Sequence, residues 1–403
     1  MFGKNKIITD PEKIDKLLTH NVEEIFVEDS LRKKLLSGDK LRIKLGFDPT
    51  GSNIHIGRAI ILRKLKEFQD LGHKITFIVG TFTAQIGDPS DKLEKRPMLR
   101  MREIEKNLKN YKEQVGKILD LNKVSFHYNG DWLGKMKFHK VAELAESFTV
   151  AQMTARRNFK ERLDKGDNVS LREFLYPLMQ GYDSVHLKSD VEIGGYDQLF
   201  NLKAGRIIQR HYGQPEQDIM ATVMLEGTDG RKMSTSQGNV INITDEPSDM
   251  FGAVMSLRDN LIVKYFKACT DVEKTKIDEI EKALKENRLN PKEAKEKLAT
   301  EIITIYHNKT KAKHAKENWN RTFSQGGVPE DTPEIKVSKG TELSQVLVDE
   351  KIISSKSEWS RLVKGGGISS IEKDQKITNP HYVISESMTY KVGKRRWIKT
   401  ILE

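Results

Sequence analysis

The pattern of apolar and polar positions in the first part of the chain predicts a parallel β-sheet with helical connections. Residues 41–48, LRIKLGFD, have the apolar content of a strand, and the following PTG interrupts it. Apolar residues then recur at helical spacing through IGRAIILRKLKEFQDLGH, and 74–80, KITFIVG, has the composition of a buried strand. A strand, a helix and a second strand in this order form the βαβ unit of a parallel sheet.

Helical periodicity dominates much of the remaining chain. We predict helical structure over 10–40 and one long helix over 102–119. From 249 to 323 the chain is rich in Lys, Glu, Ala and Leu at helical spacing, which predicts a helical domain. Residues 324–340 have the glycines, prolines and charges of a linker, so a separate small domain is expected after it.

Charge adds a candidate partner to this picture. Lys and Arg number 69 against 58 Asp and Glu, and the net charge of +11 favours a polyanionic partner, although a lysine-rich composition alone also explains it. Residues 351–403 hold eleven Lys or Arg against five Asp or Glu, so about half of the net charge lies there. This basic C-terminal segment is a candidate RNA-binding surface.

Other functional classes are disfavoured by composition. The single cysteine, Cys269, excludes an intramolecular disulfide framework and a zinc site built on several thiolates. No apolar run has the length of a membrane span, and the N-terminal sequence lacks the apolar core of a signal peptide. We therefore expect a cytoplasmic protein without a membrane partner and without a tightly bound metal.

The turn between the first predicted strand and its helix has the residues of a phosphate-binding site. Gly57 lets a nucleotide approach the backbone, and the helix N-terminus supplies amide donors. His55 and Arg58 add side-chain donors for phosphate oxygens. An ordinary tight connection remains the alternative.

A second turn, EGTDGRKMSTSQGN, presents a lysine between glycine and serine residues. Lys232 in this turn is able to swing onto a pyrophosphate group and neutralise its developing charge. A solvated surface hairpin is the alternative interpretation.

A polar row lies on an otherwise apolar helix, REFLYPLMQGYDSV. Tyr176, Gln180 and Asp183 fall at i, i+4 and i+7, so they share one face. Burying a phenol, an amide and a carboxylate is costly unless they meet a polar ligand or buried partners. The row predicts a binding pocket, and a structural hydrogen-bond network is the alternative.

Together these motifs resemble those of a known enzyme class. HIGR resembles the HIGH signature and KMSTS the KMSKS signature of class I aminoacyl-tRNA synthetases. Within that class the chain resembles a bacterial-type tyrosyl-tRNA synthetase nearly from end to end, because GFDPT, IGDPS, TVAQM, FLYPLMQGYDS and the later GG-DQ-FN stand in family order.

The resemblance implies a fold and a domain order. It implies a Rossmann-like α/β catalytic domain over 1–244, an α-helical anticodon-binding domain over 245–325 and a linker over 326–340. A small α+β RNA-binding domain like that of a ribosomal small-subunit protein is implied over 341–403. Its expected phosphate contacts, each of which is alternatively a solvated surface charge, are Lys356, Arg361, Lys364, Lys394, Arg395 and Arg396.

The resemblance also implies residue roles. Asp183 matches the carboxylate that hydrogen-bonds the tyrosine hydroxyl, a contact that rejects phenylalanine because the carboxylate would otherwise be left unpaired. The residues matching those that hold the α-amino group are Asp88, Tyr176, Gln180 and Gln198. The residues matching the ATP site are Asp48, His55, Gly57, Gly195, Asp197 (which binds the ribose), Lys232 and Met233. The catalytic set is His55, Arg58, Lys232 and the two residues of a mobile basic loop, Lys92 and Arg96.

The implied reaction has two steps. The tyrosine carboxylate attacks the α-phosphate of ATP, and the tyrosyl group then passes to the terminal adenosine of tRNA(Tyr). Positioning and charge stabilisation carry catalysis without a side-chain nucleophile. The resemblance further implies Mg²⁺ on the ATP phosphates and a homodimer.

Three positions depart from the family pattern close to the chemistry. Arg58 replaces the second histidine of HIGH, Thr235 replaces the second lysine of KMSKS, and Tyr196 replaces a small hydroxyl residue. Thr235 lacks the positive charge of the lysine it replaces, and our hypothesis is that the positive charge of Arg58 near the same phosphates compensates for this loss. A double-mutant cycle with Arg58→His and Thr235→Lys tests the hypothesis. Independent effects of the two substitutions would contradict it. The departures leave two alternatives open: a catalytically weakened paralogue that binds RNA, and a ligase for a related aryl amino acid.

Overall fold

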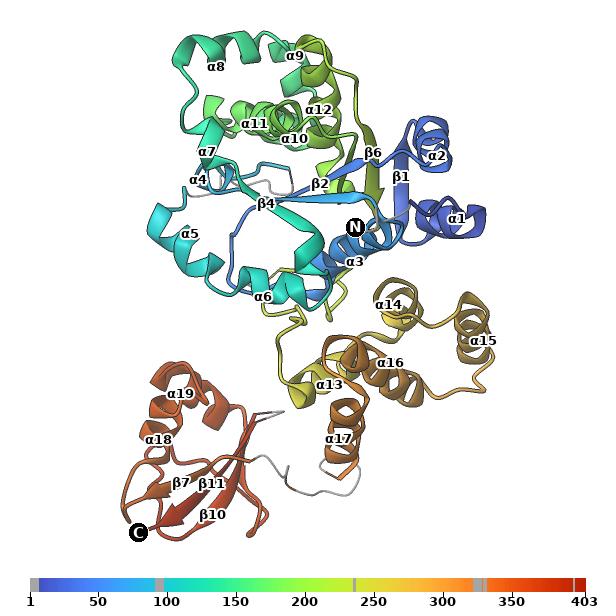
Figure 1. The fold of residues 1–403 in the computed structure, drawn as a ribbon. Coiled ribbons are helices and arrows are strands. Elements are labelled where there is room, and N and C mark those ends of the chain that lie inside the picture. The colour runs from blue at the N-terminus through green and yellow to red at the C-terminus, as the bar shows by residue number, and fades with distance from the viewer. Residues whose placement is uncertain (1–6, 91–97, 235–236, 322–327, 329–331, 394–395) are drawn as a thin grey trace.

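Six strands form a largely parallel sheet in the N-terminal part of the molecule (Figure 1). The computed structural model describes residues 7–90, 98–234, 237–321, 328, 332–393 and 396–403. The strand order is β1-β6-β5-β2-β3-β4, in which β1 alone is antiparallel, to β6. The strands are β1 (Val22–Phe26), β2 (Arg42–Phe47), β3 (Lys74–Val79), β4 (Val124–Tyr128), β5 (Val191–Gly195) and β6 (Asp218–Thr222). The predicted α/β class is confirmed.

The predicted βαβ unit is confirmed as β2, α3 (Ile56–Asp70) and β3. Figure 1 shows α3 on one side of the sheet and α11 and α12 on the other. From β2 the chain order proceeds outward to β3 and β4 on one side and to β5 and β6 on the other. This reversal between β2 and β5 opens a crevice at the carboxyl ends of the strands, the usual ligand position in such sheets.

Helices cover the sheet and its loops. The helices of the N-terminal part are α1 (Pro11–Thr19), α2 (Glu28–Leu36), α4 (Thr83–Ile86), α5 (Met101–Leu108), α6 (Tyr111–Gly116), α7 (Gly130–Leu133), α8 (Phe138–Ala145), α9 (Val150–Thr154), α10 (Arg157–Asp164), α11 (Leu171–Leu187) and α12 (Leu199–His211). Helix α11 begins at a capping box in which Ser170 and Glu173 exchange side-chain and backbone hydrogen bonds. Its capped start and its packing against α12 hold the polar row of α11 in place.

Two helix predictions were wrong in part. Residues 10–40 contain α1 and α2, but β1 lies between them as an edge strand, because pairing with β6 decides its conformation. Residues 102–119 hold α5 and α6 instead of one long helix. Asn110, between them, has backbone angles outside the helical region and interrupts the helix.

The predicted helical segment is confirmed. Its helices are α13 (Pro247–Met255), α14 (Ile262–Cys269), α15 (Lys274–Lys285), α16 (Pro291–Tyr306) and α17 (Lys309–Trp319). Their buried apolar side chains form one continuous core with those of the large sheet and α3. The boundary at residues 244 and 245 stays a prediction.

The C-terminal segment has its own sheet, of order β7-β11-β10-β8-β9, and its own apolar core. Its elements are β7 (Glu334–Val337), α18 (Leu343–Asp349), α19 (Lys356–Lys364), β8 (Ile368–Ser370), β9 (Gln375–Lys376), β10 (Met388–Val392) and β11 (Arg396–Leu402). Two short helices and a glycine turn into a strand are confirmed. Strand β7 lies inside the predicted linker and pairs with β11, so that part of the linker belongs to the sheet. Within the described ranges, each helix is too short or too polar to cross a bilayer.

Candidate active site

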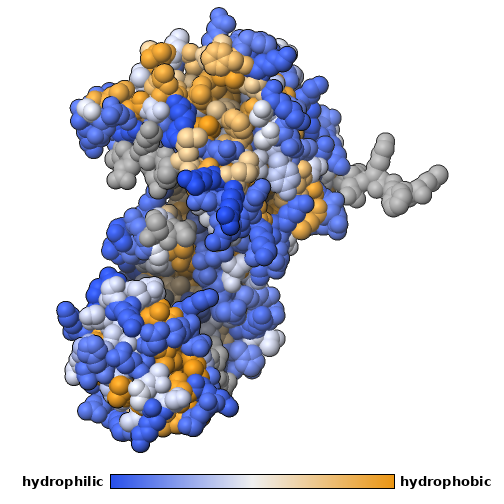
Figure 2. Space-filling view, turned by 90° about the vertical axis from the view of Figure 1, so that its left-hand side faces the viewer, coloured by the Kyte–Doolittle hydropathy of each residue, from blue (hydrophilic) through white to orange (hydrophobic). Residues whose placement is uncertain are grey.

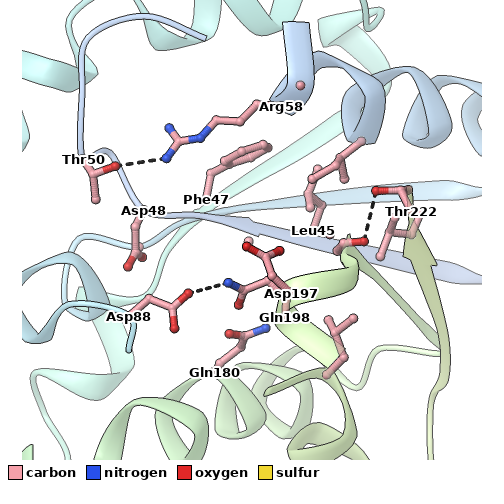
Figure 3. Close-up of a pocket in the computed structure, with 18 of the residues that line it drawn as sticks. Leu45, Phe47, Asp48, Thr50, Arg58, Asp88, Gln180, Asp197, Gln198 and Thr222 are labelled. Atoms are coloured by element: carbon pink, nitrogen blue, oxygen red, sulfur yellow. Dashed lines mark hydrogen bonds between the residues drawn. The ribbon is translucent and has the colours of Figure 1, made fainter. Parts of the chain in front are cut away.

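A pocket of about 410 Å³ opens in the crevice between β2 and β5 (Figure 3). Segments that are far apart in the chain meet here: the turn after β2, the loop after β3, one face of α11, the end of β5 and the hairpin after β6. The sequence-predicted residues in its lining are Asp48, His55, Gly57, Arg58, Asp88, Tyr176, Gln180, Asp183, Gly195, Asp197, Gln198, Lys232 and Met233. The polar row of α11 therefore shares one cavity with the glycine turn.

His55 caps the N-terminus of α3 at the mouth of this pocket. Its Nδ1 accepts a hydrogen bond from the Arg58 backbone N–H at 3.3 Å. Burial, and secondly the Arg58 charge, lower the pKa of His55 to about 3, so the imidazole is neutral at physiological pH. Because Nδ1 accepts, the proton of the neutral ring is on Nε2, which is left as a hydrogen-bond donor.

Gly57 lies where the two signature turns touch. A Cβ atom at this position would lie 3.0 Å from Met233 Sδ and 3.2 Å from His55 Nδ1. Both contacts are tighter than ordinary van der Waals contact, so the absence of a side chain lets the hairpin after β6 close over the start of α3.

The Arg58 guanidinium lies beside the pocket and is held by three neighbours. It donates to Thr50 Oγ1 at 3.0 Å and to the Tyr111 hydroxyl at 3.3 Å, and it lies 5.6 Å from the centre of the Phe47 ring. Figure 3 shows Arg58 and Thr50 together at one edge of the cavity. Its cation thus lies at the edge of the pocket formed by the turn after β2.

The lysine of the second signature contacts the carboxylate after β5. Lys232 Nζ lies 3.3 Å from Asp197 Oδ2, and the Lys232 side chain is about half exposed. A Cβ at Gly195 would lie 2.7 Å from Asp197 Oδ1, so this glycine leaves room for the carboxylate. Tyr196 is 43% exposed and is absent from the lining among the described residues, so its side chain leaves the Asp197 carboxylate uncovered.

Asp88 anchors one end of the cavity. Its Oδ2 accepts from Gln198 Nε2, and its Oδ1 accepts from the Ser90 backbone N–H at 2.9 Å and from Asn201 Nδ2 at 3.3 Å. Sequence reasoning missed Asn201, although it lies within the FN pair of the family pattern. An anionic carboxylate held by three donors is suited to bind an ammonium group.

Tyr176 reaches across the pocket from α11 to the turn after β2. Its hydroxyl donates to Asp48 Oδ2 at 2.9 Å, and Asp48 Oδ1 accepts from Thr83 Oγ1 at 2.6 Å. One turn further along α11, Gln180 Nε2 donates to Glu192 Oε1 at 3.1 Å. The polar row is thus buried among polar partners and also lines the pocket.

Asp183 is the most deeply buried carboxylate of the lining. Its Oδ1 accepts from Trp132 Nε1 at 2.8 Å and its Oδ2 from Asn129 Nδ2 at 3.3 Å. Burial raises the pKa of Asp183 to about 7, while the Lys44 charge, Trp132 and Asn129 oppose the rise. Sequence reasoning missed Asn129, Trp132 and Lys44, because only the fold brings them to α11.

Some predicted residues lie elsewhere. Lys356, Arg361 and Lys364 are exposed on α19, as a contact surface requires. Arg396 pairs with Glu358 at 2.9 Å, so its guanidinium ties β11 to α19. Residues outside the described ranges are Lys92, Arg96, Thr235, Lys394 and Arg395.

The described residues offer no cluster for a resident metal. Among them, no group of three or more His, Cys, Asp or Glu side chains is arranged to hold an ion.

Comparisons with known proteins agree on one family. Residues 36–324 match the family described as tRNA synthetases class I (W and Y). The chain is 43% identical over 392 residues to a protein of Thermotoga maritima named tyrosine–tRNA ligase, covering 96% of this chain and 97% of that one. It is 41% identical over 393 residues to a protein of Clostridium acetobutylicum named tyrosine–tRNA ligase 2, covering 96% of this chain and 98% of the other.

Solved structures share the fold. A C-terminally truncated mitochondrial tyrosyl-tRNA synthetase of Aspergillus nidulans superimposes with a TM-score of 0.62 at 21% identity, covering 77% of this chain and 93% of that one. A tyrosyl-tRNA synthetase of Archaeoglobus fulgidus, solved with L-tyrosine, gives 0.60 at 22% identity, covering 76% and 99%.

Proposed function

This chain belongs to the class I tRNA synthetases for tryptophan and tyrosine, and from this premise we infer that it is a tyrosine–tRNA ligase. The relatives of that name match it along nearly its whole length. The single structural observation that supports the inference is the joining of the polar row of α11 with both signature turns in one pocket. Such a pocket is able to hold a phenolic amino acid against ATP.

The residue roles implied by the resemblance are compatible with the positions of these side chains in the pocket. Asp88, Tyr176, Gln180 and Gln198 surround the α-amino group, and Asp183 accepts a hydrogen bond from the phenol hydroxyl. Asp197 binds the ribose, and the neutral His55 donates from Nε2 to a phosphate oxygen. These groups orient the tyrosine carboxylate toward the α-phosphate.

Lys232 and Arg58 supply positive charge for the departing pyrophosphate. Both side chains line the ATP side of the pocket. We propose that Mg²⁺ arrives on the ATP phosphates, whose charge it would neutralise, since the described residues offer no metal cluster. Lys92 and Arg96 stay candidates for the same task.

Tyrosine-dependent exchange of pyrophosphate into ATP, followed by charging of tRNA(Tyr), tests this function. We expect exchange with tyrosine and none with phenylalanine or tryptophan at equal concentration. A folded protein that binds tRNA but exchanges with no aryl amino acid would instead be a catalytically weakened paralogue. Because tRNA is charged where translation occurs, we place the enzyme in the cytoplasm.

We propose that the basic face of α19 binds the tRNA backbone. Replacing Lys356, Arg361 and Lys364 together by glutamine should weaken tRNA binding and reduce its salt dependence by about one unit of slope for each lost phosphate contact. Filter binding over a salt series measures both, and pyrophosphate exchange should stay unchanged.

A matched control for α19 is available at the N-terminus. Lys13, Lys16 and Lys33 are equally exposed and lie on α1 and α2. Their replacement by glutamine removes the same charge from another surface. If both triple variants lose tRNA affinity equally, the effect is one of net charge and α19 is not the contact surface.

We propose that the enzyme is a homodimer formed through α8, α9 and the start of α11. Figure 2 shows apolar side chains gathered at the end of the molecule where α8 and α9 lie. In this region Phe138 is 88% exposed, Leu171 79% and Val150 70%. Large exposed apolar side chains on neighbouring elements are typical of a protein interface.

Leu171→Asp should dissociate this dimer. A charge in an apolar interface is desolvated without a partner, so sedimentation should move from a dimer toward the 46.2 kDa monomer. Val383→Asp is the control, since Val383 is 48% exposed in the C-terminal domain. A monomeric unmodified protein would contradict the proposal.

A further inference from the structure

Beneath the tyrosine pocket lies an ion pair that is excluded from water. Lys44 on β2 and Glu192 on β5 are register partners in the sheet, and their Nζ and Oε1 atoms are 2.9 Å apart. Each side chain is 1% exposed. A protein with two apolar residues in such a place is often as stable as one with a buried ion pair. The Lys44–Glu192 pair is therefore a candidate for a role other than stabilising the fold.

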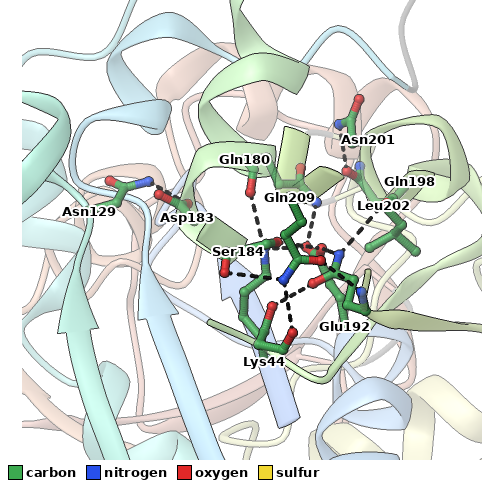
Figure 4. Close-up of polar contacts among 12 residues, drawn as sticks. Lys44, Asn129, Gln180, Asp183, Ser184, Glu192, Gln198, Asn201, Leu202 and Gln209 are labelled. Atoms are coloured by element: carbon green, nitrogen blue, oxygen red, sulfur yellow. Dashed lines mark hydrogen bonds and ion pairs between the residues drawn. The ribbon is translucent and has the colours of Figure 1, made fainter. Parts of the chain in front are cut away.

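The pair is joined to the helix that carries the polar row (Figure 4). Lys44 Nζ donates to the Gln180 backbone carbonyl at 3.1 Å and also to Ser184 Oγ, so with Glu192 all three of its protons have acceptors. Glu192 Oε2 accepts from Ser184 Oγ and from Gln217 Nε2. The pair thereby attaches α11 to two central strands.

Glu192 decides which way the Gln180 amide faces. Glu192 Oε1 lies 3.1 Å from Gln180 Nε2, and a carboxylate only accepts hydrogen bonds. The amide nitrogen must therefore face Glu192, which leaves the amide oxygen for a donor in the pocket. An ammonium group is such a donor. With an amide in place of Glu192, either orientation of Gln180 would be allowed.

Lys44 acts on the other end of the amino acid. Burial raises the pKa of Asp183 to about 7, and the Lys44 charge is the strongest influence that opposes this rise. The groups facing Asp183 from the surrounding elements are Lys44 of β2, Glu192 of β5, Trp132 of α7 and Asn129. His186 of α11 stacks on Trp132 with ring centres 4.3 Å apart. Among these groups Lys44 is the cation nearest in effect to Asp183, whereas His186 carries a charge only when its ring is protonated.

We propose that the Lys44–Glu192 pair positions both ends of the tyrosine substrate. Glu192 holds Gln180 with its amide oxygen toward the ammonium group. Lys44 donates to the Gln180 carbonyl and to Ser184, the residue next to Asp183, and so fixes the part of α11 that presents Asp183 to the phenol. The pair contacts neither end directly, so both are positioning residues. The proposal rests on the function inferred above. It adds that two residues outside the pocket lining contribute to the recognition of tyrosine.

Two variants separate the halves of this proposal. Lys44→Met with Glu192→Gln removes both charges together and leaves no orphaned ion. Glu192→Asp keeps the charge pair but shortens the carboxylate that reaches Gln180. Pyrophosphate exchange measured against tyrosine, against ATP and over pH 6 to 9 gives the readouts, with thermal unfolding alongside.

The double variant should raise the KM for tyrosine on the order of tenfold, the size of a lost hydrogen bond to a charged group, and leave the KM for ATP within about twofold. The pH at which tyrosine use is half-maximal should also rise, because Lys44 lowers the pKa of Asp183 by more than Glu192 raises it, and the variant removes both charges. Glu192→Asp should raise the KM for tyrosine without moving that pH. Both variants should thus change the use of tyrosine and leave the use of ATP nearly unchanged.

A second buried pair is the control. Arg162 and Glu173 are 2.6 Å apart and 2% and 3% exposed, and both lie outside the pocket lining. Glutamine at position 173 can keep the capping box of α11 with Ser170, so Arg162→Met with Glu173→Gln should change stability without a selective change in the KM for tyrosine. If that control raises the tyrosine KM equally, or if both Glu192 variants keep the unmodified KM and pH profile, the Lys44–Glu192 pair is only structural. An unmodified protein without tyrosine-dependent exchange would contradict the inferred function itself.

Discussion

Replacing Lys232 by alanine is expected to slow the formation of tyrosyl-adenylate by about a hundredfold or more. Lys232 Nζ lies 3.3 Å from Asp197, the carboxylate proposed for the ATP ribose. We expect binding of the ribose hydroxyls to Asp197 to free the lysine to move toward the phosphates. Its charge then matters most as negative charge develops on the departing pyrophosphate, so kcat should fall while the KM for tyrosine stays nearly constant.

Single-turnover measurement of adenylate formation tests this expectation. Lys264→Ala is a suitable control, because Lys264 is similarly exposed and pairs with Glu226 at 2.6 Å beside the same hairpin. A rate loss below about fivefold for Lys232→Ala would mean that Arg58 or another cation carries the charge stabilisation.

Replacing Asp183 by asparagine is expected to remove most of the preference for tyrosine over phenylalanine. A site built to bond a hydroxyl discriminates by about 10⁴ or more. With phenylalanine, Asp183 would keep Trp132 and Asn129 as donors but lose the hydrogen bond from the phenol. Asparagine keeps the shape but loses the charge that strengthens the phenol contact. We expect kcat/KM for tyrosine to fall about a hundredfold, with that for phenylalanine unchanged or higher.

The same variant should stabilise the free protein above neutral pH. The pKa of Asp183 is raised to about 7 in the folded state from an ordinary 3.8, so the folded state binds more protons than the unfolded state between these values. The contribution of this group to the free energy of unfolding therefore decreases as pH rises through that range. Thermal unfolding at pH 5 and pH 8 should show a gain for Asp183→Asn only at pH 8.

An equal unfolding temperature for both proteins at pH 8 would contradict the burial argument. Unchanged selectivity against phenylalanine would contradict the assignment of Asp183 to the phenol. The two readouts are independent, because one is measured without substrate.

Much of the candidate site was accessible from local sequence. Tyr176, Gln180 and Asp183 share a helix face because an α-helix repeats every 3.6 residues. His55 and Gly57 were placed at a strand-to-helix turn because the apolar pattern changes its period there. These inferences needed no knowledge of distant residues.

The edge strand and the divided helix were not predictable in this way. Val22–Phe26 is a strand because β6 lies beside it. The sequence around these residues does not indicate that β6 will be their partner. The break near Asn110 leaves the helical pattern on either side intact. For β1, pairing with the neighbouring strand overrode the local pattern.

The sequence by itself determined the βαβ start of the sheet, the polar face of α11 and the identity of the two signature turns, because each depends on residues within a few turns of one another. Only the tertiary structure decided that Trp132 and Asn129 hold Asp183, and that Lys44 finds Glu192 across the sheet. A strand pattern indicates which side chains are buried, but strand order decides which of them meet. For this enzyme, that order places the buried cation of Lys44 in contact with the helix proposed to recognise the substrate.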